Sequence, residues 1–123
     1  MTQEDKDLLL KDLCARLPYG IKASYYGAEE ECETWDEIEC VTRDGYVDIG
    51  QYSLPIECIK PYLFPLSSMT DEQEKEYNKL NCYEFGCFPH TEEALDYLIK
   101  NHFDYRGLIE KELAIDATGL NIY

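Results

Sequence analysis

The sequence predicts an α+β protein with an N-terminal helix, a small antiparallel sheet of three to four strands, and then two to three helices. Three observations support this class. Leucines recur at helical spacing near the N-terminus, β-branched and aromatic residues with turn signals fill about 21–60, and two capped helical patterns follow residue 70. A chain of 123 residues fits one domain, 1–123.

The first helix is expected from about Thr2 to Leu17. Thr2 is the expected N-cap, and Glu4 and Asp5 lie in the first turn, where the helix dipole favours anions. The expected apolar face comprises Leu9, Leu10, Leu13, Cys14 and Leu17, with Lys11 and Asp12 on the other side. Pro18 follows and ends the helix.

Short antiparallel strands are expected across the next forty residues or so. They are placed at 21–26, 34–41, 46–49 and 56–59. The strand at 34–41 alternates imperfectly, which predicts a β-bulge. Asp44-Gly45 predicts a hairpin, because both residues tolerate positive φ.

The segment 61–69 carries two prolines and is expected to cross the core as an extended chain rather than as a regular element. Helices are then expected at about 70–82 and 91–101, with a short helical piece at 108–113. Thr70 and Gln73 form a capping-box pattern at the start of the first, and Thr91 caps the second.

The charge balance excludes several classes of partner. Asp and Glu number 26 against 11 Lys and Arg, a formal charge of −15. Phosphates would be repelled, so we expect no direct binding of nucleic acid and none to an anionic membrane. The charge favours a basic protein partner or no partner at all. The N-terminus lacks the pattern of a signal peptide and no apolar run reaches the ~18 residues of a spanning helix, so a cytoplasmic location is expected.

Three blocks of the chain carry a resemblance: KDLCARLPYG at 11–20, IKPYLFPLSSMT at 59–70 and HFDYRGLIEKELAI at 102–115. They resemble a family of short uncharacterised proteins of gut bacteria and their phages. The resemblance implies a bacterial, phage or prophage setting in the cytoplasm and implies no particular activity. The acidic segment 27–39 lies outside the three blocks.

Seven carboxylates fall within eleven residues at 29–39, with no Lys or Arg among them. Together with the tryptophan in the same stretch they are the predicted partner-binding residues: Glu29, Glu30, Glu31, Glu33, Trp35, Asp36, Glu37 and Glu39. Carboxylates two apart on a strand project from one face at roughly 6.8 Å, a spacing that could imitate a phosphate backbone. The alternative is a solvated loop and edge strand whose charges prevent edge-to-edge pairing.

We expect no metal, no cofactor and no catalytic residue. The acidic run lacks the glycine of a calcium-binding EF-hand loop. Cys82, Cys87 and His90 are spaced C-x₄-C-x₂-H, with His102 further on, which is not the usual zinc spacing. Two thiols and a surface histidine are the simpler interpretation. Arg106 is expected to be a structural pair for a nearby acid.

The six cysteines are expected to be free and mostly buried thiols, because the chain shows no secretion signal. The leading hypothesis is a non-enzymatic acidic accessory or inhibitory protein that binds a basic protein surface, with mimicry of a nucleic acid as one form of that binding. One alternative is a small Cys/His-dependent enzyme using Cys82 or Cys87 with His90. The other is a structural or assembly protein. The sequence sets no oligomeric state.

Overall fold

The N-terminal helix begins where its capping residues predict. In the computed structural model, which describes residues 2–25, 34–83, 86–87 and 92–123, helix α1 spans Gln3–Arg16. Thr2 Oγ1 accepts a hydrogen bond from the main-chain N–H of Asp5 at 3.1 Å, and the Asp5 carboxylate accepts one from the N–H of Thr2. This reciprocal capping box satisfies two main-chain donors that the helix itself cannot. The predicted helix and its N-cap are confirmed.

The face that α1 buries differs from the predicted one. Leu9, Asp12, Leu13 and Arg16 are fully buried, whereas Cys14 is exposed. The prediction that Asp12 faces away from the core is therefore wrong. The ion pair is tolerated inside because its two charges compensate each other, with Arg16 Nε donating to Asp12 Oδ2 at 2.8 Å.

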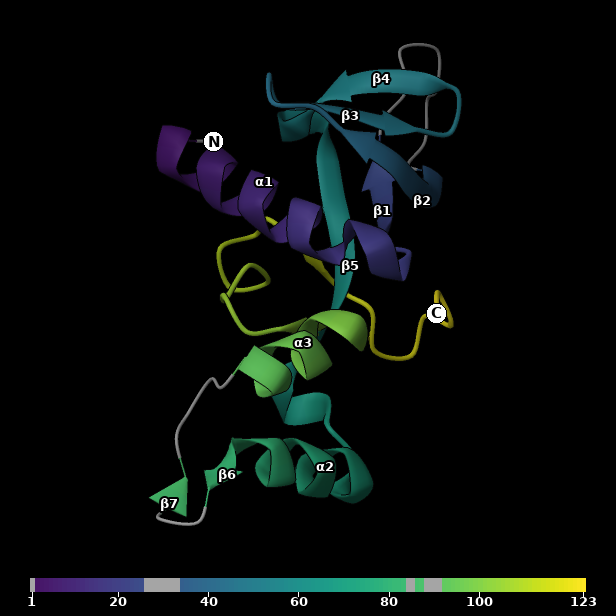
Figure 1. The fold of residues 1–123 in the computed structure, drawn as a ribbon. Coiled ribbons are helices and arrows are strands. Elements are labelled where there is room, and N and C mark those ends of the chain that lie inside the picture. Colours follow the sequence, from purple (N-terminus) through teal and green to yellow (C-terminus); the bar gives the residue numbers. More distant parts are fainter. Residues whose placement is uncertain (1, 26–33, 84–85, 88–91) are drawn as a thin grey trace.

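A seven-stranded mixed sheet forms the centre of the fold (Figure 1). Its strands are β1 (Lys22–Tyr25), β2 (Thr34–Val41), β3 (Tyr46–Ile49), β4 (Tyr52–Pro55), β5 (Ile59–Pro65), β8 (Phe103–Asp104) and β9 (Ile115–Asp116). The order is β4-β3-β2-β1-β5-β8, and β9 also pairs with β5. The pairings from β4 to β5 are antiparallel, whereas β8 and β9 pair with β5 in parallel.

The predicted antiparallel sheet of three to four strands is therefore wrong in size and in type, although the overall class is α+β. The segment expected to cross the core as an irregular extended chain instead forms most of β5, which pairs with β1 and, on its two opposite edges, with β8 and β9. Strands β8 and β9 have two residues each. Such short strands carry no alternating pattern that a sequence could reveal.

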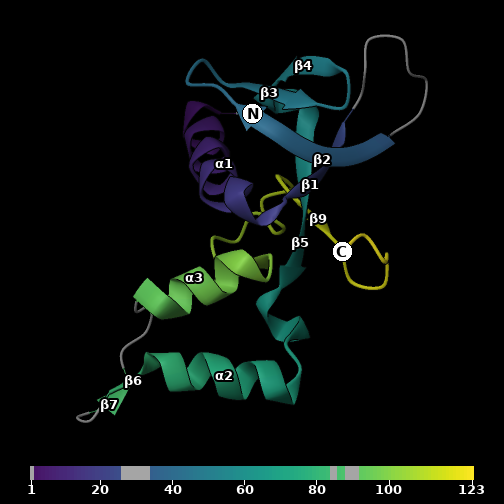
Figure 2. The same cartoon turned by 45° about the vertical axis from the view of Figure 1, so that its right-hand side comes forward.

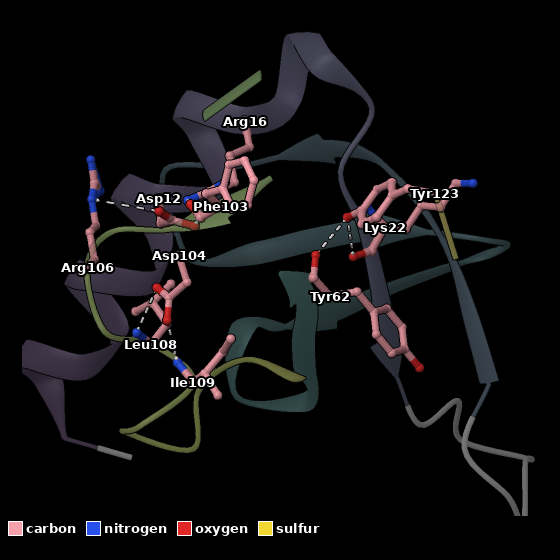
Figure 3. Close-up of polar contacts among 10 residues, drawn as sticks. All are labelled: Asp12, Arg16, Lys22, Tyr62, Phe103, Asp104, Arg106, Leu108, Ile109 and Tyr123. Atoms are coloured by element: carbon pink, nitrogen blue, oxygen red, sulfur yellow. Dashed lines mark hydrogen bonds and ion pairs between the residues drawn. The ribbon is translucent and has the colours of Figure 1, made fainter. Parts of the chain in front are cut away.

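Two other expected elements, a strand and a short helix, are replaced by a 3-10 helix and by turns. Ile56–Cys58, expected as part of a strand, forms the 3-10 helix η2. The expected helical piece at 108–113 is a series of turns. There the Asp104 carboxylate accepts hydrogen bonds from the main-chain N–H groups of Leu108 and Ile109, both at 2.9 Å (Figure 3). A side chain thus takes the place of the helical carbonyls for these donors.

The hairpin between β2 and β3 and the bulge in β2 are confirmed. Gly45 takes φ +83° at the turn. The register shifts from Ile38 opposite Ile49 to Cys40 opposite Asp48, which leaves one extra residue in β2.

The 3-10 helix η1 (Leu17–Tyr19) continues α1. Towards the lower end of β5 follow the 3-10 helix η3 (Leu66–Ser68), α2 (Asp71–Asn81), a small hairpin of β6 (Cys82–Tyr83) and β7 (Gly86–Cys87), and α3 (Glu92–Lys100). The predicted capping box of α2 is present: Gln73 N–H donates to Thr70 Oγ1 at 3.2 Å and Thr70 N–H to Gln73 Oε1 at 2.9 Å. Figure 2 shows α3 between the sheet and α2.

The two faces of the sheet have different coverings. The inner face packs on α1 and forms the main core, with buried Ala23, Ile38 and Leu63 among its members. The outer face is partly covered by the C-terminal segment, residues 115–123, through a second cluster that includes Tyr62 and Ile122. The part of the outer face over β2 lies beyond this cover, where Trp35 is 49% exposed.

Candidate protein-binding surface

The structure describes four of the eight predicted partner-binding residues: Trp35, Asp36, Glu37 and Glu39, all exposed on β2. The others, Glu29, Glu30, Glu31 and Glu33, lie outside the described residues. Strand β2 lies between β1 and β3, but its residues 34–37 pair with β1 and its residues 38–41 pair with β3. Trp35, Asp36 and Glu37 are therefore paired on one side only, and protection of a free sheet edge stays an alternative account of the charges there.

The register of β1 and β2 separates these residues onto two faces. Directly opposed residues of an antiparallel pair share a face. Trp35 lies opposite Ser24 and Glu37 opposite Lys22, two positions apart on the outer face, whereas Asp36 lies opposite the fully buried Ala23. Asp36 therefore belongs to the inner side, where its Oδ2 lies 3.6 Å from the position that a β-carbon on Gly50 would take.

Alternation along β2 places Glu39 on the same face as Glu37 and Trp35, and the bulge brings Cys40 to that face as well. Ile38 before it is buried in the main core, and Val41 after it packs against the same core. The two residues between them, Glu39 and Cys40, are both exposed. We name the exposed set Trp35, Glu37 and Glu39 the β2 surface.

Trp35 is held in place on this surface by a lysine. Lys22 Nζ lies 5.5 Å from the centroid of the Trp35 ring and 5.6 Å from that of Tyr123, and it donates a hydrogen bond to the main-chain oxygen of Ile122 at 2.8 Å. A cation against an indole ring is attractive. The contact fixes one side of the indole while nearly half of the residue stays exposed.

The outer face carries cations as well as acids. Lys22 lies opposite Glu37, and Lys60 on β5 lies opposite Ser24 on the same face. The described residues therefore do not form an uninterrupted row of carboxylates. A phosphate-like row would have to be supplied by the acids at 29–33, outside the described residues.

The C-terminal segment is attached to the sheet through Tyr123. Its hydroxyl donates to the main-chain oxygen of Tyr62 at 2.8 Å and accepts from the main-chain N–H of Lys22 at 3.0 Å (Figure 3). Burial of this hydroxyl raises the pKa of Tyr123, because the phenolate would lose its hydration. The phenol is therefore neutral at ordinary pH and able to donate.

The alternative Cys/His site lies only partly within the described residues, so the convergence of its side chains stays a prediction. Cys82 and Cys87 are opposed in the β6–β7 hairpin, and His90 lies outside the described residues. His102 follows the last turn of α3, at the opposite end of a nine-residue helix that is about 13 Å long. Among the described residues no three His, Cys, Asp or Glu side chains are grouped as a metal site requires.

The cysteine prediction is wrong for the three thiols that the structure describes. Cys14, Cys40 and Cys58 are free, as expected, but they are exposed rather than buried. Cys14 lies off the buried face of α1, and Cys40 is on the outer side of β2 after the bulge. Neither position can be inferred without knowing which face each element buries.

Sequence reasoning also missed a buried charge cluster beneath α1. Arg16 donates to Asp12 and, through Nη2, to the main-chain oxygen of Phe103 at 2.6 Å. Arg106 Nε lies 3.7 Å from Asp12 Oδ1, which confirms the expectation that Arg106 pairs with an acid (Figure 3). Both guanidinium groups lie over the ring of Tyr105, whose pKa burial raises. One signal in the sequence could have revealed this cluster: Asp12 and Arg16 lie one helical turn apart, next to the leucines of the expected apolar face.

Comparison with known protein families, with curated proteins and with solved structures finds no match. The resemblance of three blocks to proteins of gut bacteria and phages thus stays a prediction. None of the described helices has the length and apolar composition that a bilayer crossing requires.

Proposed function

We propose that this protein is a non-enzymatic accessory or inhibitory protein that binds a basic protein surface through the β2 surface. The observation that carries the proposal is the exposed Trp35 on the same open face as Glu37 and Glu39. Tryptophan is the residue most enriched among binding hot spots, because it buries a large rigid area at low entropic cost. Carboxylates beside it steer a basic partner and set its orientation.

The location of the β2 surface supports the same function. Neighbouring parts of the outer face are filled by the C-terminal segment, so an incoming partner would meet the indole and the two carboxylates first. The lysine behind the indole reduces the freedom that Trp35 would lose on binding. With Lys22 and Lys60 on the same face, the surface suits a partner with a mixed but predominantly basic patch.

Charge-reversed variants test this proposal. The variant E37K/E39K changes the β2 surface, and E72K/E74K changes two exposed acids on α2 by the same amount of charge. Each is immobilised and exposed to a bacterial lysate at low and at moderate salt. The expected result is one retained protein that wild type and E72K/E74K hold, that E37K/E39K loses, and that salt releases.

The retained protein is then purified and titrated against Trp35→Ala. A hot-spot tryptophan is expected to cost at least about 2 kcal/mol, or roughly thirtyfold in Kd. Far-UV circular dichroism checks that each variant is folded. Equal loss of binding by both charge-reversed variants would show that only net charge matters, and the β2 surface would then be rejected.

A further inference from the structure

A cavity of about 410 Å³ lies where the end of α3, the end of β5 and the C-terminal segment meet. Phe64, His102, Phe103 and Tyr123 line it with rings, and Lys100 and Gln73 contribute polar groups. Its volume falls in the range of about 300–1,000 Å³ that is typical of small-molecule sites. It is separate from the β2 surface, although Tyr123, which lines the cavity, contacts the Lys22 that lies against Trp35.

His102 occupies a backbone position that normally belongs to glycine. It is the second residue after α3 and takes φ +63°, the left-handed conformation that often ends a helix. Its N–H donates to the oxygen of Ile99 at 3.1 Å, and its carbonyl accepts from the N–H of Phe64 at 2.8 Å. A glycine here would avoid the strain of a β-carbon, so the imidazole is retained at an energetic cost.

The imidazole of His102 lines the cavity and is held in place by its neighbours. It stacks on Tyr123 with ring centroids 3.9 Å apart and an interplanar angle of 12°. Only 9% of the residue is exposed, and its buried Nδ1 has no hydrogen-bond partner among the described residues. Burial, and then the charges of Arg16 and Lys22, lower its pKa to about 4, so the ring is neutral at pH 7.

The charge of the cavity is opposite to that of the chain. Among the described residues, its lining contains Lys100 but no aspartate or glutamate, in a protein with 26 acids and 11 basic residues. Lys100 is exposed and forms no ion pair with the described residues. An anion entering here therefore meets an ammonium group that no described carboxylate neutralises.

We propose that this cavity binds a small planar aromatic acid, with its ring against the aromatic wall and its carboxylate paired with Lys100. The half-buried Phe64 provides much of that wall, since its ring lies 5.9 Å from Tyr123 and 6.3 Å from Phe103 in tilted arrangements. Aromatic rings favour such offset and tilted contacts with a further ring. Gln73 and Asn101 supply amide groups near the polar end of the ligand.

The test is an NMR titration of the full chain with indole-3-acetate, alongside its neutral amide, indole-3-acetamide. We expect saturable amide shifts at Lys100, His102 and Gly119 with the acid, and at least tenfold weaker binding of the amide. Equal binding of the two compounds would overturn the assignment of an anionic ligand. Absent or unsaturable shifts with both would overturn the site.

Two variants locate the binding within the cavity. Lys100→Gln removes the cation, and because Lys100 is exposed the substitution should leave the fold intact. It is expected to weaken the binding of indole-3-acetate at least tenfold. Lys111→Gln is its matched control, because Lys111 is exposed and outside the cavity lining. His102→Asn removes the ring while keeping a residue that tolerates positive φ, and it is expected to weaken both compounds. Wild-type affinity in Lys100→Gln would reject the pairing.

Discussion

Asp12 and Arg16 lie one turn apart on α1, with both side chains fully buried and joined by a hydrogen bond of 2.8 Å. This pair lies in the C-terminal half of α1, on the same buried face as Leu9 and Leu13. Arg106 approaches the other oxygen of the same carboxylate at 3.7 Å. One carboxylate therefore compensates two guanidinium groups that connect α1 to the chain after β8.

Replacing Asp12 by Asn is expected to destabilise the protein strongly. The substitution keeps the shape but leaves Arg16 as an uncompensated buried charge, which typically costs about 3–5 kcal/mol. The free energy of unfolding in urea measures the effect. Asp7→Asn is the control, because Asp7 is exposed on the same helix and is expected to change stability by no more than about 0.5 kcal/mol. A loss below about 1 kcal/mol in Asp12→Asn would contradict this account of the cluster.

His102 is expected to make stability depend on pH in the acid range. Its pKa is about 4 in the folded state, below the ordinary value of 6.5. The unfolded chain therefore binds a proton between these values while the folded chain does not, and stability falls as pH drops from about 6.5 to about 4. Relative to His102→Asn, the wild type should lose about 3 kcal/mol across this range, measured by urea unfolding at each pH. Parallel pH profiles of the two proteins would refute the assignment.

Tyr123→Phe is expected to loosen the C-terminal segment. The variant removes one hydrogen bond to Tyr62 and one from Lys22, so about 1–2 kcal/mol of stability should be lost. Faster amide hydrogen exchange in 115–123 should accompany the loss. Tyr46→Phe serves as the control, because Tyr46 is largely exposed. Unchanged exchange in Tyr123→Phe would show that the segment is held by its apolar contacts alone.

The raised pKa of Tyr123 is expected to make stability depend on pH in the alkaline range as well. The folded state holds the phenol neutral above the ordinary value of 10.0, so the unfolded chain loses this proton first. The contribution of Tyr123 to stability is present below pH 10 and declines as pH rises beyond it. Ultraviolet titration should show one fewer late-ionising tyrosine in Tyr123→Phe than in wild type.

Thiol labelling discriminates between the sequence-based expectation and the structure. Cys14, Cys40 and Cys58 are exposed, so iodoacetamide should modify all three in the native protein without denaturant. Peptide mass spectrometry identifies the modified positions. Labelling of these three only after unfolding would mean that the thiols are buried, as the sequence alone had suggested.

The sequence was informative where local chemistry decides the structure. Thr2 and Thr70 cap their helices because the side chains that complete each box lie three residues ahead. Asp44-Gly45 marks a hairpin for a similarly local reason. The parallel strands β8 and β9 could not be predicted, because each is defined only by its pairing with β5, some forty residues or more away.

The candidate surface was predictable only in part. Composition pointed to the acids around Trp35. The register of β1 and β2 decides the rest: it puts Asp36 and Glu37 on opposite faces of the sheet and places Lys22 opposite Glu37. The cavity at His102 left a fainter signal. Helix α3 is followed by Asn101-His102 and no glycine until Gly107, so a left-handed residue ending this helix would have to be a non-glycine residue, and it is His102.

Tyr123 is at once a wall of the cavity and a contact of Lys22, the lysine that lies against Trp35. A molecule in the cavity that displaces this phenol also changes the support of the indole on the other side of the C-terminal segment. Thermodynamic linkage then requires the influence to run in both directions: occupancy of either site alters the affinity of the other by the same factor. One aromatic side chain thus touches both the proposed ligand and the lysine that supports the indole of the proposed protein-binding surface.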